Sequence, residues 1–94
     1  MKKFNMNNTV KVKLSSKGAE VKNIINSGTN KFFEDRGIKD IKKLKVNYVE
    51  GDVYEQQLWT LMSEFGPGLI TGSESPFIDC EIYFNDEELK DIEI

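Results

Sequence analysis

The sequence predicts an α+β domain in which a small, mainly antiparallel sheet of about three strands is covered on one face by two or three helices. Three observations predict it: an amphipathic stretch around the only tryptophan, three short segments that alternate between apolar and polar residues, and the chain length. Ninety-four residues suffice for one hydrophobic core but not for two. We therefore expect a single domain over residues 1–94, with the polar residues 1–8 as a flexible arm.

The stretch around the tryptophan is predicted to form the central helix, which would begin after Asp52 and end at Gly66. Its apolar residues recur at steps of three and four, the spacing of one helical face; they are Val53, Leu58, Leu61, Met62 and Phe65. Asp52 can cap the first turn, and Glu55 would complete a capping box. Gly66 tolerates left-handed geometry and Pro67 cannot continue a helix, so the pair predicts a stop. Trp59 lies off the main apolar stripe and is expected to be partly buried.

Three segments are predicted to be strands, because their apolar and polar residues alternate and would lie on opposite faces. They are residues 9–14, 44–49 and 78–84. In the last segment the side chains expected on the core side are Ile78, Cys80, Ile82 and Phe84.

The charges of the first and last segments indicate that these two strands pair. Lys11 and Lys13 lie on the polar face of one, and Asp79 and Glu81 lie on the polar face of the other. Opposite charges that face each other across two strands stabilise the pair by a few tenths to ~1 kcal/mol.

Between the first two strands, the sequence predicts two short helices. Ser15 and Ser16 offer an N-cap for a helix over residues 19–25, which Ser27 and Gly28 would end. Thr29 would cap a second helical piece that closes at Gly37, and one further turn is expected to lead into the strand at residue 44.

The composition argues against catalysis and against a metal site. There is no histidine, so the usual general base near neutral pH is missing and a Cys/His zinc site is excluded. Cys80 is the only cysteine, which rules out an internal disulfide, and a buried thiol in apolar surroundings is inert. The glycine-rich residues 66–72 follow a helix, whereas phosphate cradles precede one. We expect no catalytic residues, no cofactor and no metal.

The charge is distributed unevenly along the chain. Residues 1–48 carry twelve Lys and Arg against four Asp and Glu, a net of +8, whereas residues 49–94 carry one Lys against twelve acids, a net of −11. Either the halves neutralise each other across the folded sheet, or one pole stays exposed and steers a charged partner. No apolar run reaches the ~18–20 residues that cross a bilayer, and no apolar signal-peptide core follows Met1. We therefore expect a cytoplasmic protein without membrane contact.

The basic residues between positions 31 and 45 resemble a nucleic-acid-binding patch in composition. They are Lys31, Arg36, Lys39, Lys42, Lys43 and Lys45, with Phe32 and Phe33 nearby. An isoelectric point near 5.0 and a single arginine argue against direct nucleic-acid binding. The acidic half raises the opposite possibility, a surface that imitates nucleic-acid charge and occupies a nucleic-acid-binding host protein.

Three stretches together resemble a family of short proteins encoded by phages and prophages of Gram-positive bacteria. They are VKVKLSSKG at residues 10–18, QLWTLMSEFGP at residues 57–67, and Gly72 followed by Pro76-Phe77 and the strand at 78–84. The resemblance covers about half of the residues, and residues 23–47 match nothing in it. The family carries no established activity, so the resemblance implies only a phage origin. Small non-enzymatic phage proteins often act on host machinery, including CRISPR–Cas systems and nucleotide-signal pathways.

These observations predict a phage-encoded anti-defence or host-takeover protein that binds a host protein stoichiometrically, in the host cytoplasm, through an acidic surface. The residues expected to bind are Glu50, Glu55, Glu64, Glu74, Asp86, Glu87 and Glu88, with Tyr54, Trp59 and Tyr83 at the edge. One alternative is a homo-oligomer that sequesters a nucleotide signal, with Lys and Arg of residues 31–45 and the Gly68–Gly72 connector lining an intersubunit pocket. Another is an accessory protein of phage assembly.

Overall fold

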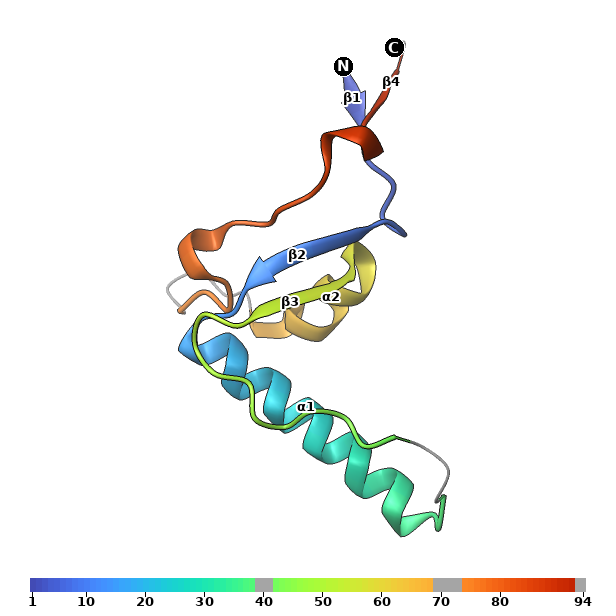
Figure 1. The fold of residues 1–94 in the computed structure, drawn as a ribbon, viewed down its shortest axis with the longest axis vertical. Helices are drawn as coiled ribbons and strands as arrows, with labels where there is room; N and C mark the ends of the chain where they lie inside the picture. The colour runs from blue at the N-terminus through green and yellow to red at the C-terminus, as the bar shows by residue number, and fades with distance from the viewer. Residues whose placement is uncertain (39–41, 69–73, 93–94) are drawn as a thin grey trace.

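The computed structural model describes residues 1–38, 42–68 and 74–92 (Figure 1). Over these ranges the chain has the predicted α+β class, with two helices and two separate antiparallel sheets of two strands each. The elements are β1 (Lys2–Lys3), β2 (Thr9–Lys13), α1 (Ser16–Asp35), β3 (Val53–Gln57), α2 (Leu58–Phe65) and β4 (Lys90–Asp91), with 3-10 turns at Gly66–Gly68, Ile78–Cys80 and Asp86–Glu88. The predicted three-stranded sheet is replaced by the pairs β2–β3 and β1–β4.

The first predicted strand is confirmed as β2. Val10 and Val12 are buried, and the residues between and beside them are exposed, as the alternation predicts. Its partner is β3, with Val12 opposite Tyr54 in an antiparallel register. β1 and β4 pair at the far end of the molecule, so the two ends of the chain lie together (Figure 1), and the Ile92 N–H donates to the Met1 carbonyl at 3.1 Å. The predicted flexible arm at residues 1–8 thus contains a short strand.

The two short helices predicted after β2 form a single helix of 20 residues, α1. Ser15 is the N-cap, because its hydroxyl accepts from the Gly18 N–H at 3.1 Å. The predicted stop at residues 27–29 is wrong: the Thr29 hydroxyl donates to the Ile25 carbonyl at 3.1 Å and so bonds within the helix instead of capping a new one. Gly37 adopts a left-handed conformation (φ +68°) just after the helix, as expected for its end.

The tryptophan stretch is only partly helical, which corrects the prediction of a helix over residues 53–65. Its first five residues form β3, and α2 begins at Leu58. The N–H groups of Leu58 and Trp59 donate to the carbonyls of Asn8 and Met6, both at 3.1 Å, so backbone rather than a capping side chain satisfies the first turn. Asp52 instead accepts from the Val49 N–H at 3.0 Å within a turn. Gly66 is right-handed (φ −53°), not the left-handed cap that was expected.

The other two predicted strands are wrong as regular strands. Residues 44–49 have no strand partner and run beside α1. In the last segment Asp79 and Cys80 both adopt φ +58°, which breaks the extended conformation, and the Cys80 side chain is exposed instead of buried in the core. Phe84, also expected inside, is half-exposed.

The predicted pairing of residues 78–84 with residues 9–14 is present only as isolated bridges. Tyr83 pairs with Lys11, and Phe77 pairs with Leu14. The predicted contacts of Lys11 and Lys13 with Asp79 and Glu81 do not form among the described residues, where Lys11 lies 3.9 Å from Glu55 on β3.

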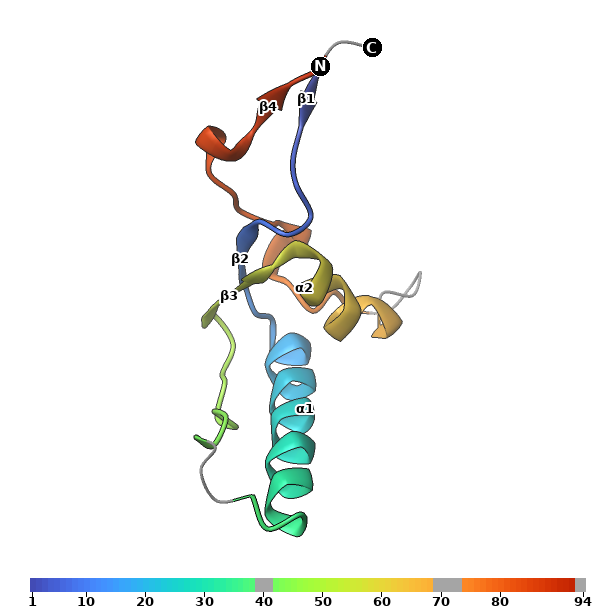
Figure 2. The same ribbon diagram turned by 90° about the vertical axis from the view of Figure 1, so that its right-hand side faces the viewer.

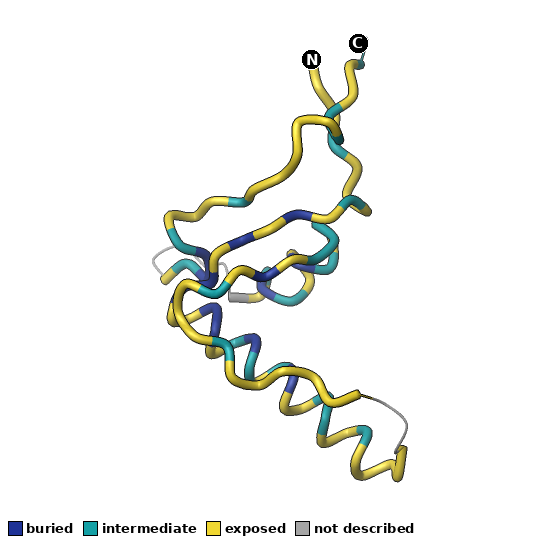
Figure 3. Tube along the Cα trace, in the orientation of Figure 1, coloured by how far each residue is buried: buried dark blue, intermediate teal, exposed yellow. Residues whose placement is uncertain are grey.

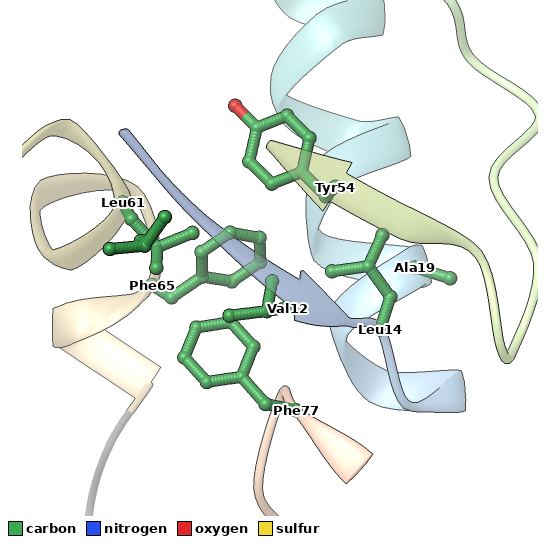
Figure 4. Packing of buried hydrophobic residues seen from close by; sticks show 8 residues of the cluster. Val12, Leu14, Ala19, Tyr54, Leu61, Phe65 and Phe77 are labelled. Carbon is green, nitrogen blue, oxygen red and sulfur yellow. The ribbon is translucent and has the colours of Figure 1, made fainter. Parts of the chain in front are cut away.

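The hydrophobic core lies where β2, β3 and α2 meet (Figure 4). Its members are Val10, Val12, Leu14, Ala19, Tyr54, Leu61, Phe65 and Phe77. Phe65 is at the centre, with ring centroids 6.2 Å from Tyr54 and 5.2 Å from Phe77, both in edge-on geometry. Of α1, only Ala19 near its start belongs to this core, so most of the long helix extends beyond it (Figure 2).

The molecule is elongated, measuring 51 × 33 × 21 Å. Its radius of gyration is 15.7 Å, whereas a compact chain of this length has a radius of gyration of about 12 Å. It exposes 7045 Å² of surface, where a compact monomer of this mass exposes roughly 5,500 Å². Burial is concentrated near β2 and β3, and both ends of the molecule are largely exposed (Figure 3). The fold therefore leaves about 1,500 Å² more surface in contact with water than a compact chain would.

Candidate binding surfaces

The C-terminal residues 74–92 form an acidic strap that crosses the molecule from the start of α1, along β2, to the chain ends (Figure 1). The strap carries seven carboxylates and one lysine: Glu74, Asp79, Glu81, Asp86, Glu87, Glu88 and Asp91, with Lys90. Asp91 pairs with Lys2. None of the other six is in an ion pair with a residue that the structure describes, and most of them are exposed.

The strap is fixed to the body of the protein at three places. Near its start, the Pro76 carbonyl accepts from the Ser15 N–H at 2.9 Å, and the Ser15 hydroxyl donates to the Ser75 carbonyl at 2.6 Å. In the middle, Tyr83 and Lys11 exchange two backbone hydrogen bonds of 2.8 and 2.9 Å. At the end, β4 pairs with β1. The strap backbone is thus positioned, while the carboxylates between these anchors face solvent.

A cleft of about 150 Å³ lies between the strap and the β2–β3 pair. It is lined by Thr9, Lys11, Glu55, Tyr83, Phe84, Asn85 and Glu88. The Tyr83 hydroxyl donates to Glu81 at 2.8 Å, and this hydrogen bond is the main reason that the pKa of Tyr83 is raised. One carboxylate oxygen of Glu88 is buried and has no hydrogen-bond partner among the described residues. The cleft thus combines negative charge with two half-exposed aromatic rings.

The structure brings together some of the residues predicted to bind and separates others. Glu55, Tyr83 and Glu88 meet at the cleft, and Glu74, Asp86 and Glu87 are exposed on the strap. Glu50 is exposed on the turn before β3, and Trp59 is 48% exposed on α2. Tyr54 and Glu64 lie in the interior, with Tyr54 only 8% exposed, so they do not contribute to an accessible surface.

Tyr54 and Glu64 belong instead to a buried polar network with Lys22 of α1. Lys22 donates to one Glu64 oxygen, and the Tyr54 hydroxyl donates to the other at 2.7 Å. The Lys22 nitrogen also lies 4.7 Å from the centre of the Tyr54 ring. Burial lowers the pKa of Lys22, but the hydrogen bonds to Glu64 and Tyr54 outweigh it and the pKa is raised. The network therefore joins α1 to α2 and β3.

Three asparagines of α1, which the sequence prediction missed, hold residues 44–48 against the helix. Asn23 donates to the Tyr48 carbonyl at 3.0 Å and accepts from its N–H at 2.8 Å. Asn30 makes the same pair of bonds with Leu44, at 2.9 and 2.8 Å. Asn26 donates to the Lys45 carbonyl at 2.7 Å. Asparagines at positions i, i+3 and i+7 lie on one face of a helix, and this spacing is the sequence pattern that could have predicted the contact with residues 44–48.

The asparagines give the protein an arm, defined here as residues 27–38 together with residues 42–48. Asn30 joins its two segments through the bonds to Leu44, and Asn23 and Asn26 hold residues 45–48 from the preceding turns of α1. Several apolar side chains of the arm are exposed, namely Phe32, Ile38, Leu44 and Val46. It carries five cations, Lys31, Arg36, Lys42, Lys43 and Lys45, against Glu34 and Asp35. The guanidinium of Arg36 lies 4.8 Å from the centre of the Phe32 ring. The arm is thus a positively charged end of the molecule with apolar side chains on its outside.

A shallow groove of about 610 Å³ separates the first half of α1 from residues 48–50. Ile24 and Val49 line it and are 64% and 62% exposed, and Glu20 and Glu50 are the charged residues in its lining. A second cleft, of about 270 Å³, lies between the end of α1 and residues 42–43; it is lined by Asn30, Phe33, Glu34, Gly37, Ile38, Lys42 and Lys43.

Comparison with known proteins adds no family: no family model, curated protein or solved structure matches the chain. Within residues 1–38, 42–68 and 74–92, no three His, Cys, Asp or Glu side chains are grouped so that they could hold a metal ion. No helix in the same part of the chain is long and apolar enough to cross a membrane.

Proposed function

We propose that the chain is a phage-encoded, non-enzymatic protein that binds a host protein stoichiometrically and so blocks a defence or other host process. The partner is a protein with a basic surface, such as a nucleic-acid-binding immune effector of the CRISPR–Cas type. The binding site is the acidic strap with the cleft beside it. The observation that carries the proposal is the strap itself, an anchored backbone whose carboxylates are mostly exposed and outside any ion pair with a described residue.

The charges of the strap suit attraction to a basic partner. Seven carboxylates against one lysine within nineteen residues create a negative field, which raises the rate of encounter with a positively charged surface. A nucleic-acid-binding protein offers such a surface, because it neutralises phosphates with Lys and Arg. The strap therefore presents the charge that a phosphate backbone would present.

The aromatic residues near the strap supply contacts that charge alone does not. Tyr83 and Phe84 are half-exposed at the cleft. Aromatic side chains are enriched among the residues that dominate binding energy in protein interfaces. Carboxylates around half-exposed rings give a site with an apolar centre and a charged rim, the usual anatomy of a protein interface.

The experiment is affinity capture from a host lysate with the tagged protein and two matched variants. In the first variant, Asp86→Lys and Glu87→Lys reverse two exposed strap carboxylates. In the second, Lys42→Glu and Lys43→Glu reverse two exposed cations of the arm, so the overall charge changes by the same amount in the opposite direction. We expect the strap variant to lose the partner and the arm variant to retain it, because only the strap is proposed to contact it.

Equal recovery of the same partner by wild type and strap variant would contradict an electrostatic mechanism at the strap. Loss of the partner from both variants would mean that net charge or the arm is involved, and would also contradict the site. Circular dichroism of both variants serves as the folding control.

A second function, sequestration of a nucleotide signal, is favoured by the cleft at the arm. Lys42 and Lys43 lie there with the Phe33 ring and Asn30, a combination that suits a phosphate and a base. Most of the Gly68–Gly72 connector, which was predicted to share such a pocket, lies outside the described residues. Calorimetry against cyclic and ADP-ribose-type nucleotides separates the two functions: heat of binding that Lys42→Glu with Lys43→Glu abolishes would support sequestration.

A further inference from the structure

We infer that the protein also associates with itself, head to tail, with the basic arm of one copy on the acidic strap of the next. The inference rests on the proposed function, because it uses the same strap, and it adds regulation: a second copy competes with the host partner for that site. The arm and the strap lie toward opposite ends of the long molecule (Figure 1). One copy can therefore use both surfaces at once.

The charges of the two surfaces favour this pairing over the alternatives. The arm carries five cations against two acids, although Lys45 is paired with Asp52 at 3.5 Å. The strap carries seven acids, of which Asp91 is paired with Lys2, against one lysine. Two arms brought together would repel, as would two straps, whereas an arm and a strap attract each other. A contact of arm on arm or of strap on strap is thus disfavoured, and a contact between the two different surfaces is favoured.

The molecule also exposes enough surface for two contacts with neighbouring copies. The chain exposes about 1,500 Å² more than a compact monomer of its mass. A typical protein interface buries about 800 Å² on each partner. A copy inside a head-to-tail chain buries two such patches, and the elongated molecule is largely exposed at both ends (Figure 3).

Apolar side chains are exposed at both surfaces and would be covered by the contact. Phe32, Leu44 and Val46 face outward on the arm, and Tyr83 and Phe84 do so on the strap. Monomeric soluble proteins seldom expose large contiguous apolar patches. Covering these residues gives the contact a hydrophobic contribution in addition to the attraction between charges.

Sedimentation of the wild-type protein over a range of concentrations tests this inference. We expect the average mass to rise steadily with concentration, because a head-to-tail contact does not stop at two copies unless it closes into a ring. We also expect the mass to fall as ionic strength rises, because salt screens exposed charges. A monomer at all concentrations, or a dimer that forms equally well at high salt, would overturn the inference.

The strap and arm variants provide a sharper test, because each removes the attraction in a different way. Asp86→Lys with Glu87→Lys makes the strap more basic, and Lys42→Glu with Lys43→Glu makes the arm more acidic, so each variant alone is expected to be monomeric. Mixed in equal amounts, the two should form pairs, because the unaltered arm of the strap variant attracts the unaltered strap of the arm variant. Association of either variant alone to the wild-type extent would overturn the contact.

The same variants separate this inference from the proposed function. If both are correct, the arm variant captures the host partner while it has lost self-association. If only self-association is correct, the variants sediment as described but all of them recover the same host proteins. If only the proposed function is correct, the strap variant loses its partner while the wild-type protein sediments as a monomer.

Discussion

Lys22 of α1 and Glu64 of α2 form an ion pair in the interior, with only 9% and 15% of their side chains exposed. The pair connects the long helix to the core, to which α1 also contributes the buried Ala19 and the partly buried Val21. Tyr54 completes the arrangement by donating to the second Glu64 oxygen. The orientation of α1 relative to the core therefore depends on a polar contact as well as on apolar packing.

Removing one partner of this pair should destabilise the protein strongly. Glu64→Ala leaves the Lys22 charge buried without its carboxylate, and we expect the free energy of unfolding to fall by about 3 kcal/mol, the lower part of the range for broken buried pairs. The double variant Lys22→Met with Glu64→Leu should recover most of this loss, because no charge is then left unpaired. Urea denaturation followed by circular dichroism measures both. A loss below about 1 kcal/mol in Glu64→Ala would show that the pair is solvated.

The same network predicts instability at alkaline pH. Burial raises the pKa of Tyr54 above 10.0, and hydrogen bonds to Glu64 and Tyr54 raise that of Lys22 above 10.5. A group with a raised folded-state pKa contributes stability that is complete below its unfolded value and is lost as pH rises through the folded value. We therefore expect stability to decline above about pH 10. Urea midpoints measured across this range should fall less steeply in Tyr54→Phe, and an unchanged slope would contradict the assignment.

Gly18 and Gly28 of α1 should respond in opposite ways to alanine. A Cβ at Gly18 would lie 2.0 Å from the Pro76 carbonyl oxygen, which the Ser15 N–H already holds, so Gly18→Ala should cost about 2 kcal/mol or more despite the helix propensity of alanine. A Cβ at Gly28 meets no atom within 4 Å, so Gly28→Ala should stabilise the protein by about 0.5–1 kcal/mol. Thermal and urea unfolding measure both. Stabilisation by both substitutions would show that the strap does not contact α1 at Pro76.

The asparagines of α1 should protect individual amides of residues 44–48. Asn23→Ala removes the acceptor of the Tyr48 N–H and should speed hydrogen exchange at Tyr48 more than at Leu44. Asn30→Ala removes the acceptor of the Leu44 N–H and should do the reverse. Each lost bond is expected to cost about 1 kcal/mol locally. Amide exchange followed by NMR compares the two variants, and equal acceleration at both sites would indicate that residues 44–48 detach as a unit.

Features set by neighbouring residues could be predicted from the sequence, and those set by distant residues could not. The alternation in residues 9–14 and the cap at Ser15 are local and are confirmed. The apolar spacing in residues 53–57 fits a helix, but the segment forms a strand because it pairs with β2. Residues 44–49 alternate as a strand does, yet their hydrogen-bond partners are asparagine side chains of α1.

In the candidate site, too, features set by neighbouring residues could be predicted from the sequence and features set by distant residues could not. Charged side chains are rarely buried unless they are paired, so the exposure of Glu74, Asp86 and Glu87 is as expected. Glu64 and Tyr54 were assigned to the surface because such residues are usually exposed. Their burial depends on Lys22, which lies 42 residues from Glu64, and this separation in sequence hid the pairing.

The pairing of β1 with β4 also has a practical side. Because the Ile92 N–H donates to the Met1 carbonyl, a peptide or carrier protein attached ahead of Met1 starts beside β4, next to the carboxylates of residues 86–91. A positively charged label placed there would meet those carboxylates first. An uncharged label on a long spacer is therefore the safer choice for measurements on this molecule.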